Sequence, residues 1–514
     1  MNKDELLENK DELLEISKNF FGSVFQVENV SEKIRNLTYR EVKKVFSAHD
    51  PRDLDCIIYP YEVLFTLIFL ASLAGCKTKD DIFNFWKFNK QHLEKFFPEL
   101  YGCIPSTSTI TIARNLIAAN VMLEKMTAIF GELYNKIKVK LNAISAAHTN
   151  IAQQSLAMRD VLACDGQEMQ ATARRLPNDE RQTAFQITSI VSYNTGMTLG
   201  QVIHHKKNQE KTAILELSES INIEGSILTW DAINTTSSLI DSVVARGADV
   251  FVSLKSNQPH LYEECIDAYN EYSKGNKLYK LGENAATGSY SYVSGGKYFE
   301  KSIVVLKADD CISSDLRDKW KSIQSIAFIH TTTNDLTIGE TKTSFRVYIS
   351  SIPLDLDLYP NESQEMIQIS LKRWCVETNH YHLDRAFEQD GDRYEEEDAA
   401  YCSTIMSKLI MSIFNFAKNA YNNEEMRYKG VATTSNLQMM CLDINFSMLL
   451  AECFFANDPK KLVNHELSRK YKFMKTPEPP KETDRGSSYN LHLLKDDNCG
   501  LANFLKKKIS KKSS

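Results

Sequence analysis

The 514-residue chain lacks the features that mark several protein classes. None of its eleven cysteines belongs to a CxxC pair or a cysteine–histidine cluster, which argues against a zinc module and a disulfide framework. The longest apolar run, Val63–Cys76, includes Thr66 and Ser72 and is shorter than the roughly 20 residues that span a bilayer. The first residues, MNKDELLENKDELLE, are not a cationic-then-apolar leader. We therefore expect a cytoplasmic protein without a membrane partner.

An excess of positive charge is also missing. Lysine and arginine total 61 against 67 aspartates and glutamates, which gives a net charge of −6. Proteins that bind nucleic acids are usually basic, because phosphate contacts dominate their affinity. A DNA-binding function would therefore need a locally basic surface and a specific site. The final residues, LKKKISKKSS, are either a solubilising tail or a phosphate-contacting arm.

Length and composition allow three or four packed units. Hydrophobic residues make up 43% of the chain and charged residues 25%, as in ordinary globular proteins. The heptapeptide NKDELLE at 2–8 repeats at 9–15, which predicts an acidic amphipathic helix, either a solvated cap or part of a coiled coil. Three further helices are expected between 61 and 120, and they form either a plain bundle or a helix-turn-helix DNA reader.

The middle of the chain alternates between strand and helix patterns. The expected elements are a hairpin, a helix, a strand, a helix and a strand, at 184–203, 211–222, 226–233, 236–247 and 249–257. Such alternation indicates an α/β sheet. Residues 288–352 then predict strands without helices, and helices are expected again at 369–387 and 398–421. A linker rich in proline, serine and charge follows at 475–488.

Two aspartates lie at or near the ends of expected buried strands. Asp165 follows an apolar run in VLACDGQEMQ, and Asp231 lies between Trp230 and Ala232 in SILTWDAI. A carboxylate in such a place is costly unless it is paired, protonated or bound to metal. Taken singly, Asp165 fits a turn before a glycine, and Asp231 fits a buried pair as well as it fits a functional site.

A third acid, Glu377, lies on the expected helix 369–387. Arg373, four residues earlier, shares its helix face, and alone the two form an ordinary surface pair worth about 0.3–0.5 kcal/mol. Together, however, two strand-borne aspartates and a helix-borne glutamate can converge at one edge of a sheet. Carboxylates suit Mg²⁺. Two such ions about 3.5–4 Å apart can clamp the attacking and leaving oxygens of a phosphoryl transfer.

These segments resemble the DDE insertion-sequence transposases, most closely the branch of H-repeat-associated proteins. The resemblance is carried by DPRDLDCIIYPYEVLFTLIFLASLAGCKTKDDI, by CDGQEMQ, by ILTWDAINTT with RGADVFVSLKSNQPHL, and by VYISSIP with RWCVE. Asp165 precedes Asp231 by 66 residues, and Asp231 precedes Glu377 by 146. In the family a β-rich insertion occupies the longer interval. The similar region extends over roughly residues 50–420.

The resemblance implies a protein of several parts. Residues 1–150 would form a helical N-terminal module that binds DNA ends. An α/β ribonuclease H-like catalytic core would comprise 155–260 and 346–425, with the β-rich insertion at 261–345 between them. A mainly helical C-terminal extension with the linker and the basic tail would occupy 426–514.

The resemblance also implies a chemistry, namely metal-dependent DNA cleavage and strand transfer at insertion-sequence ends. Asp165, Asp231 and Glu377 would hold Mg²⁺ or Mn²⁺, two ions in all, and Arg373 would orient a phosphate. Lys255, Asn257, Gln258 and Lys372 are expected to bind DNA. The partners would be double-stranded DNA, both element ends and target, and a second copy of the chain in a homodimer.

Three positions depart from the family pattern. Gln167 replaces a lysine, Ser370 stands where related transposases have tyrosine, and Asp384 stands where many have lysine. These departures bear on the efficiency of the reaction and on the leaving-strand mechanism. Two alternatives stay open. One is a ribonuclease H-like nuclease that cuts without strand transfer, and the other is a catalytically decayed or domesticated DNA-binding protein.

Overall fold

The structure is a computed structural model of the chain. It describes residues 57–97, 100, 102–115, 131, 134–135, 155–156, 159–175, 181–204, 209–359, 361–387, 389, 397–422, 433–455, 458–465 and 468. The repeated heptapeptide, the linker at 475–488 and the lysine-rich tail lie outside these residues.

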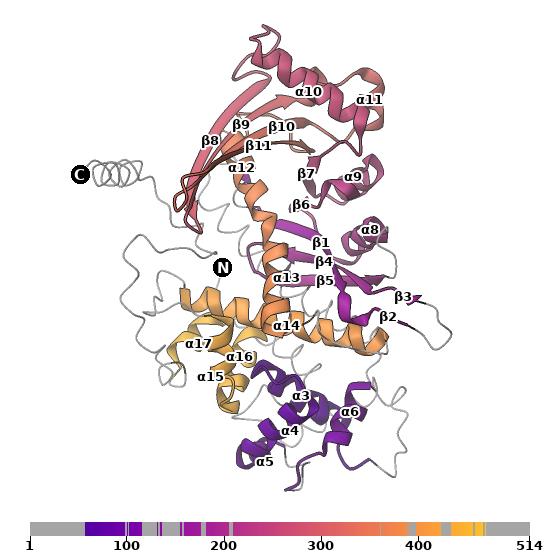
Figure 1. The fold of residues 1–514 in the computed structure, drawn as a ribbon, viewed down its shortest axis with the longest axis vertical. Coiled ribbons are helices and arrows are strands. Elements are labelled where there is room, and N and C mark those ends of the chain that lie inside the picture. Colours follow the sequence, from indigo (N-terminus) through magenta and orange to yellow (C-terminus); the bar gives the residue numbers. More distant parts are fainter. Residues whose placement is uncertain are drawn as a thin grey trace, which may run out of the picture.

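Nine strands in the described part of the chain form one mixed sheet, in the order β5-β4-β1-β6-β7-β11-β10-β9-β8 (Figure 1). Its strands are β1 (Val161–Met169), β4 (Phe185–Ser192), β5 (Thr198–His204), β6 (Ile227–Thr229), β7 (Asp249–Leu254), β8 (Ala285–Ser294), β9 (Lys297–Lys307), β10 (Ser325–Asp335) and β11 (Thr341–Ser350). β1, β6 and β7 are parallel, and the other pairs are antiparallel. A separate ribbon pairs β2 (Arg174–Arg175) with β3 (Arg181–Gln182). The α/β sheet predicted from the sequence is confirmed.

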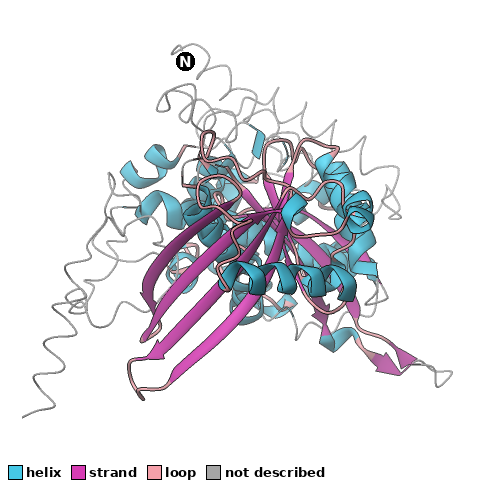
Figure 2. Cartoon of the chain, turned by 90° about the horizontal axis from the view of Figure 1, so that it is seen from above, coloured by secondary structure: helices cyan, strands magenta, loops and turns pink. Residues whose placement is uncertain are grey.

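The strands expected as a β-rich insertion extend this same sheet. β11 pairs with β7, beginning at Val347 opposite Leu254, and β10, β9 and β8 follow outward. Figure 2 shows long strands reaching out beyond the helices. In β11 the first residues are mostly exposed and the last four are buried, because only the inner half of the strand lies beneath packed helices. The boundaries 261–345 stay a prediction.

Helices cover both faces of the sheet. They are α8 (Glu210–Ser220), α9 (Ser237–Val244), α10 (Pro259–Ser273), α11 (Ser314–Lys319), α12 (Glu362–Lys372) and α13 (Trp374–Phe387). Successive side chains of β1 point to opposite faces. Ala163 packs against α13, whereas Leu162 and Cys164 belong to the core shared with α8 and α9. Since Asp165 is two residues from Ala163, its side chain lies on the α13 face.

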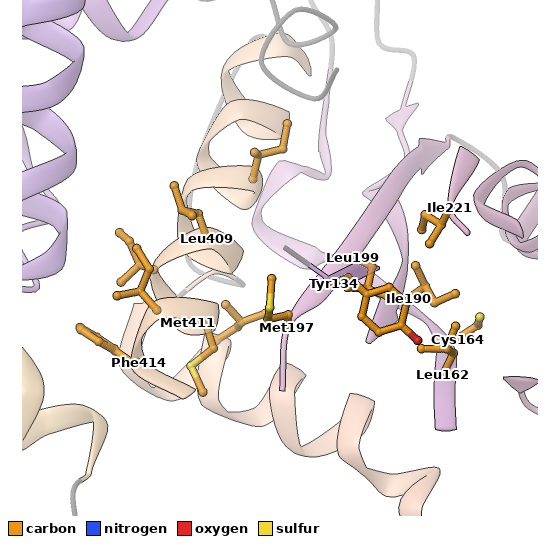
Figure 3. Close-up of a cluster of buried hydrophobic side chains, with 14 of the residues drawn as sticks. Tyr134, Leu162, Cys164, Ile190, Met197, Leu199, Ile221, Leu409, Met411 and Phe414 are labelled. Atoms are coloured by element: carbon orange, nitrogen blue, oxygen red, sulfur yellow. The ribbon is translucent and has the colours of Figure 1, made fainter. Parts of the chain in front are cut away.

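The N-terminal and C-terminal helices pack against each other below the sheet (Figure 1). They are α3 (Tyr61–Leu73), α4 (Lys79–Phe88), α5 (Lys90–Phe96), α6 (Thr107–Asn115), α14 (Glu397–Asn422), α15 (Thr434–Met440), α16 (Ile444–Phe455) and α17 (Pro459–Asn464). α3 and α6 both contact α14, and α3 also contacts α16. The core is continuous from Leu162 and Cys164 of β1 to Leu409 and Phe414 of α14, as Figure 3 shows in part.

The apolar run predicted to be a buried core helix is α3. Its side chains from Val63 onward are mostly buried, and the Trp86 Nε1–H of α4 donates to the Leu67 carbonyl at 3.0 Å. Gly75, expected to end this helix, has a φ of 83°, which favours glycine. Thr78 then begins α4 with a capping box that it shares with Asp81. No helix among the described residues is long and apolar enough to cross a membrane.

Gly288 of β8 sets the position of α12. A Cβ atom at residue 288 would lie 2.9 Å from Ser363 Oγ and 3.1 Å from the Gln364 backbone nitrogen. Beside it, the Ser363 hydroxyl donates to the Thr287 carbonyl at 2.9 Å. The missing side chain therefore allows the first turn of α12 to rest directly on the strand, and α12 leads on to α13.

Replacement of Gly288 by valine should destabilise the protein by about 1–3 kcal/mol, because the added carbons collide with the Ser363 hydroxyl and with the backbone of the first turn of α12. Valine favours strands, so the loss would report packing alone. Thermal unfolding followed by circular dichroism measures it. Ser289→Val, at the exposed neighbouring position, is the control. Equal melting temperatures for both variants would contradict this account of α12.

Candidate active site

Asp165 and Asp231 lie at the same edge of the sheet. β1 and β6 run parallel and pair Ala163 with Thr229. Each aspartate comes two residues after its paired residue. Asp165 is still within β1, whereas Asp231 directly precedes the 3₁₀ turn Ala232–Asn234 that follows β6. The two acids therefore lie side by side just beyond the paired part of β1 and β6, although β1 continues to Met169 and the expectation that Asp165 ends its strand is wrong.

Glu377 lies in the first turn of α13, beside Asp165. Cys375 and Val376 of this turn pack on Ala163 of β1, which fixes the helix over the strand. The Arg373 Nη2–H donates to Glu377 Oε1 at 2.8 Å. Only 12% of the Arg373 side chain is exposed, so its charge acts in a sheltered place. The predicted pairing of residues 373 and 377 is observed, but the single helix expected at 369–387 is wrong, because Arg373 lies at the junction between α12 and α13.

The Asp165 carboxyl group is surrounded by more negative than positive charge. Burial raises its pKa to about 7, and the carboxylates of Glu210 and Glu377 add to the increase. The Arg373 guanidinium and the backbone N–H of Gly166 act in the opposite direction. A divalent cation would supply the positive charge that this group of acids lacks, and carboxylate oxygens are the donors that Mg²⁺ prefers.

Glu210, the first residue of α8, was not singled out from the sequence. A Cβ atom at Gly166 would lie 3.2 Å from Glu210 Oε1, so the glycine leaves room for this carboxylate beside β1. The glycine next to Asp165 was the available signal, but the approach of α8 is a tertiary feature. Glu210 therefore joins Asp165 and Glu377 in the acidic surroundings of the strand end.

Buried nitrogen groups lie behind Asp165. His380 Nδ1 is 3.6 Å from Asp165 Oδ2, but burial, with help from the Lys408 charge, lowers the His380 pKa to about 3. The imidazole is therefore neutral and the pair is not an ion pair. Lys408 Nζ donates to Ser189 Oγ at 2.5 Å, and Ser189 is the cross-strand partner of Asp165. Burial lowers the pKa of Lys408 to about 7. No role had been assigned to His380 or Lys408 from the sequence.

Asp231 has its own set of partners. Lys255 Nζ lies 3.3 Å from Asp231 Oδ1, and both side chains are more than one-third exposed. Asn257 Nδ2 donates to the Ala232 carbonyl at 2.8 Å, and Gln258 Nε2 donates to the Thr235 carbonyl at 3.1 Å. Three of the residues expected to bind DNA therefore contact the Asp231 turn.

Lys372, the fourth expected DNA contact, lies away from the surface. Its exposed fraction is 5%, and its ammonium group is 5.1 Å from the centre of the Tyr193 ring. The negative charges of Asp160 and Glu365 act on it from nearby. A side chain buried in this way does not fit a phosphate contact, so we leave Lys372 out of the proposed DNA-binding residues.

Two of the three departures from the family pattern touch each other. Gln167 Nε2 donates to Asp384 Oδ1 at 2.8 Å, which joins β1 to α13 two residues beyond Asp165. The third, Ser370, is buried and its hydroxyl donates to the Ile367 carbonyl at 2.6 Å. At the two positions where the family resemblance predicts lysine, this chain therefore has a linked amide and carboxylate.

The acids suit a divalent cation by donor type and charge. Among the residues that the structure describes, no three histidine, cysteine, aspartate or glutamate side chains are grouped closely enough to hold a metal ion. Asp165 and Glu377 influence each other electrostatically, while Asp231 is engaged by Lys255. Joint binding by all three acids would thus require Asp231 to exchange its lysine partner for the metal.

Comparison with known proteins identifies the family of the region that contains these residues. Residues 157–413, half of the chain, match the family model described as the transposase DDE domain. The chain belongs to the DDE transposase family. The matched region contains Asp165, Asp231 and Glu377.

The DDE transposase relatives include H repeat-associated proteins, which confirms the branch predicted from the sequence. YncI of Escherichia coli O157:H7 is 24% identical over 284 residues, which cover 53% of this chain and 66% of YncI. The H repeat-associated YhhI of Escherichia coli K12 is 23% identical over 279 residues, 53% of this chain and 67% of YhhI. The names of both describe candidate transposases. The match thus spans about two thirds of each relative.

A solved structure of the piggyBac transposase synaptic complex with hairpin DNA aligns with 93% of this chain and 88% of its own. The TM-score is 0.38 and the identity 11%. A likeness this weak supports no conclusion about the fold or the function of the DDE transposase chain.

Asp165→Asn should stabilise the metal-free protein, increasingly so as the pH rises. The folded-state pKa of about 7 lies above the ordinary 3.8, so the ionised carboxylate costs the folded state stability as the pH rises between these values. At about 1.36 kcal/mol for each pKa unit, the gain would reach at most about 4 kcal/mol above pH 7. Thermal unfolding in EDTA at pH 5, 6 and 7.5 measures it. Asp267→Asn, on an exposed part of α10, is the control; a gain independent of pH would contradict the prediction.

Proposed function

We propose that this member of the DDE transposase family cleaves DNA at the ends of an insertion sequence and joins it to target DNA. Asp165, Asp231 and Glu377 would be its metal-binding acids. The proposal is supported by the position of the acids within the matched family region. Asp165 and Asp231 follow the paired residues Ala163 and Thr229 of adjacent parallel strands, and α13 brings Glu377 beside Asp165.

The same proposal extends to the fold and the partners. We propose that the sheet and its helices form a ribonuclease H-like core, in support of which β1, β6 and β7 are parallel and β4 and β5 antiparallel. The helices before residue 150 would bind element ends, and a homodimer would hold two ends together. Packing of α3 and α6 on α14 ties these helices to the core.

Two bound Mg²⁺ or Mn²⁺ ions would supply activation of the attacking oxygen and stabilisation of charge on the leaving oxygen. The chain's own contribution begins with Asp165, Asp231 and Glu377, which would hold the ions. Arg373 would donate to a non-bridging phosphate oxygen, a task that suits the planar guanidinium. Its hydrogen bond to Glu377 and its sheltered position fix the direction of these donors.

The positive charge of Lys255 would move from Asp231 to a DNA phosphate during the reaction. In the protein alone its ammonium group pairs with Asp231. Both side chains are exposed, so the pair is worth only about 0–1 kcal/mol and separates easily. When Asp231 binds metal, Lys255 would be released to contact a DNA phosphate next to the cut strand.

Asp231→Ala and Glu377→Gln should each lower the rate of DNA cleavage by at least about 10²-fold, comparable to the loss of an electrostatic contact in other active sites. The assay uses DNA with the element's native flanking ends, with Mg²⁺, with Mn²⁺ and with EDTA. Asp267→Ala, an exposed acid of α10, is the matched control and should retain full activity. Unchanged cleavage by Asp231→Ala would refute the site.

The products distinguish the alternatives to a transposase. Cutting followed by joining to a second DNA is the expected outcome. Cutting without joining would identify a nuclease of the same family. Binding of the end DNA without either reaction would identify a chain that has lost its chemistry.

Lys255→Ala should have opposite effects on metal and on DNA. Without its lysine partner, Asp231 should bind Mn²⁺ up to about fivefold more tightly in the absence of DNA, as the weak ion pair allows. DNA binding should weaken, and the slope of log affinity against log salt should fall by about 0.9. Calorimetry and fluorescence anisotropy measure the two effects. Lys274→Ala, which removes an exposed pair with Glu271, should change neither.

A further inference from the structure

The turn that carries Asp231 is packed at its flanks but open at its centre: Trp230, Ala232 and Thr235 are fully buried. β6 ends at Thr229, and a single 3₁₀ turn, Ala232–Asn234, follows Asp231. Two backbone hydrogen bonds of 3.0 Å close it, from the Asn234 N–H to the Asp231 carbonyl and from the Thr235 N–H to the Ala232 carbonyl. Ile233, at its centre, is 71% exposed, so apolar contacts do not secure the middle of the turn. The exposed centre of the turn therefore depends on hydrogen bonds for its support, and one of these runs from Thr235 Oγ1 to the Ser253 carbonyl of β7 at 3.3 Å.

The segment after β7 provides that support. Asn257 Nδ2 donates to the Ala232 carbonyl at 2.8 Å, and this carbonyl also accepts the Thr235 backbone N–H that closes the turn. Gln258 Nε2 donates to the Thr235 carbonyl at 3.1 Å. The two amides therefore hold both ends of the turn, at residues 232 and 235.

The supporting segment is itself rigidly placed. It begins where β7 ends, at Leu254, and β7 is an inner strand paired with β6 and β11. It ends at Pro259, the first residue of α10, where a fixed φ favours the start of a helix. The backbone N–H of Gln258 donates to the Lys255 carbonyl at 3.1 Å, which closes the segment into a turn. The side-chain amides of Asn257 and Gln258 thus fix the Asp231 turn relative to β7.

We propose that Asn257 and Gln258 are positioning residues that hold Asp231 at the metal site, and that they are not DNA contacts. The inference rests on the proposed role of Asp231. It assigns a different task to two residues that the family resemblance had suggested as DNA-binding. One N–H of each amide donates to backbone carbonyl 232 or 235, so both side chains are held against the turn.

The function of such a clamp follows from the demands of the reaction. A displacement of about 1 Å in a group that takes part in the chemistry costs on the order of 10²-fold in rate. Asp231 follows a strand of only three residues, and the two amides add hydrogen bonds to the turn that begins directly after it. Lys255 contacts the Asp231 side chain from the same segment, at 3.3 Å. Residues 255, 257 and 258 therefore act on the side chain and on the backbone of one turn.

The test uses Asn257→Leu and Gln258→Met, which keep the approximate size of each side chain and remove the amide. Ser256→Ala, in the same exposed segment, is the matched control. The full-length protein is compared in four measurements: Mn²⁺ binding by calorimetry without DNA, DNA affinity by anisotropy in EDTA, the Mn²⁺ dependence of cleavage, and hydrogen exchange of the peptide that contains residues 231–236. Thermal unfolding checks that each variant is folded.

We expect both variants to weaken Mn²⁺ binding by about three- to tenfold, the size of effect that loss of one hydrogen bond produces. The Mn²⁺ concentration for half-maximal cleavage should rise, kcat should fall, and exchange at residues 231–236 should become faster. DNA affinity in EDTA should stay unchanged. Ser256→Ala should behave as the unaltered protein in every measurement.

A loss of DNA affinity with unchanged Mn²⁺ binding and unchanged exchange would overturn the inference and make these residues DNA contacts. Unchanged behaviour in all four measurements would also overturn it. Faster exchange in the variants, combined with full cleavage by Asp231→Ala, would refute the proposed metal site but leave the clamp intact. The two proposals can therefore fail separately.

Discussion

The contact between α13 and β1 is the interaction on which the site depends. Ala163 is small, so Cys375 and Val376 lie close to the strand and bury their side chains there. That burial holds the Glu377 carboxylate near Asp165, although the two negative charges repel each other and raise the Asp165 pKa. Arg373, at the junction of α12 and α13, reduces the repulsion. Apolar packing thus maintains an arrangement of charges that would separate if α13 were free.

Sequence patterns between neighbouring residues were sufficient to predict the α/β sheet, the end of α3 and one ion pair. The alternation of strands and helices around Asp231 predicted the α/β sheet, and Gly75 after an apolar run predicted the end of α3. The spacing of Arg373 and Glu377 predicted a helical pair, which is present at 2.8 Å. In each case neighbouring residues, through periodicity or a required φ, decide the outcome.

Other features depended on the approach of distant segments and could not be read in this way. Glu210 lies near Asp165 because α8 packs over the sheet, and Lys408 lies under Ser189 because α14 crosses it. Lys372 is buried with Asp160 and Glu365, which are 212 and 7 positions earlier in the chain. A resemblance in motif also does not specify the bonding partner of a side chain, as Asn257 illustrates.

The continuity of the nine described strands has a mechanical consequence. The outer strands β8 to β11 are joined by an unbroken hydrogen-bond ladder to β7, whose end carries the clamp on the Asp231 turn. β8 also supports α12 at Gly288, and α12 leads into the helix of Glu377. The outer strands are thus connected to the site by two routes, through β7 to the Asp231 turn and through α12 to the helix of Glu377. A force applied to their far ends would act on Asp231 and Glu377 together.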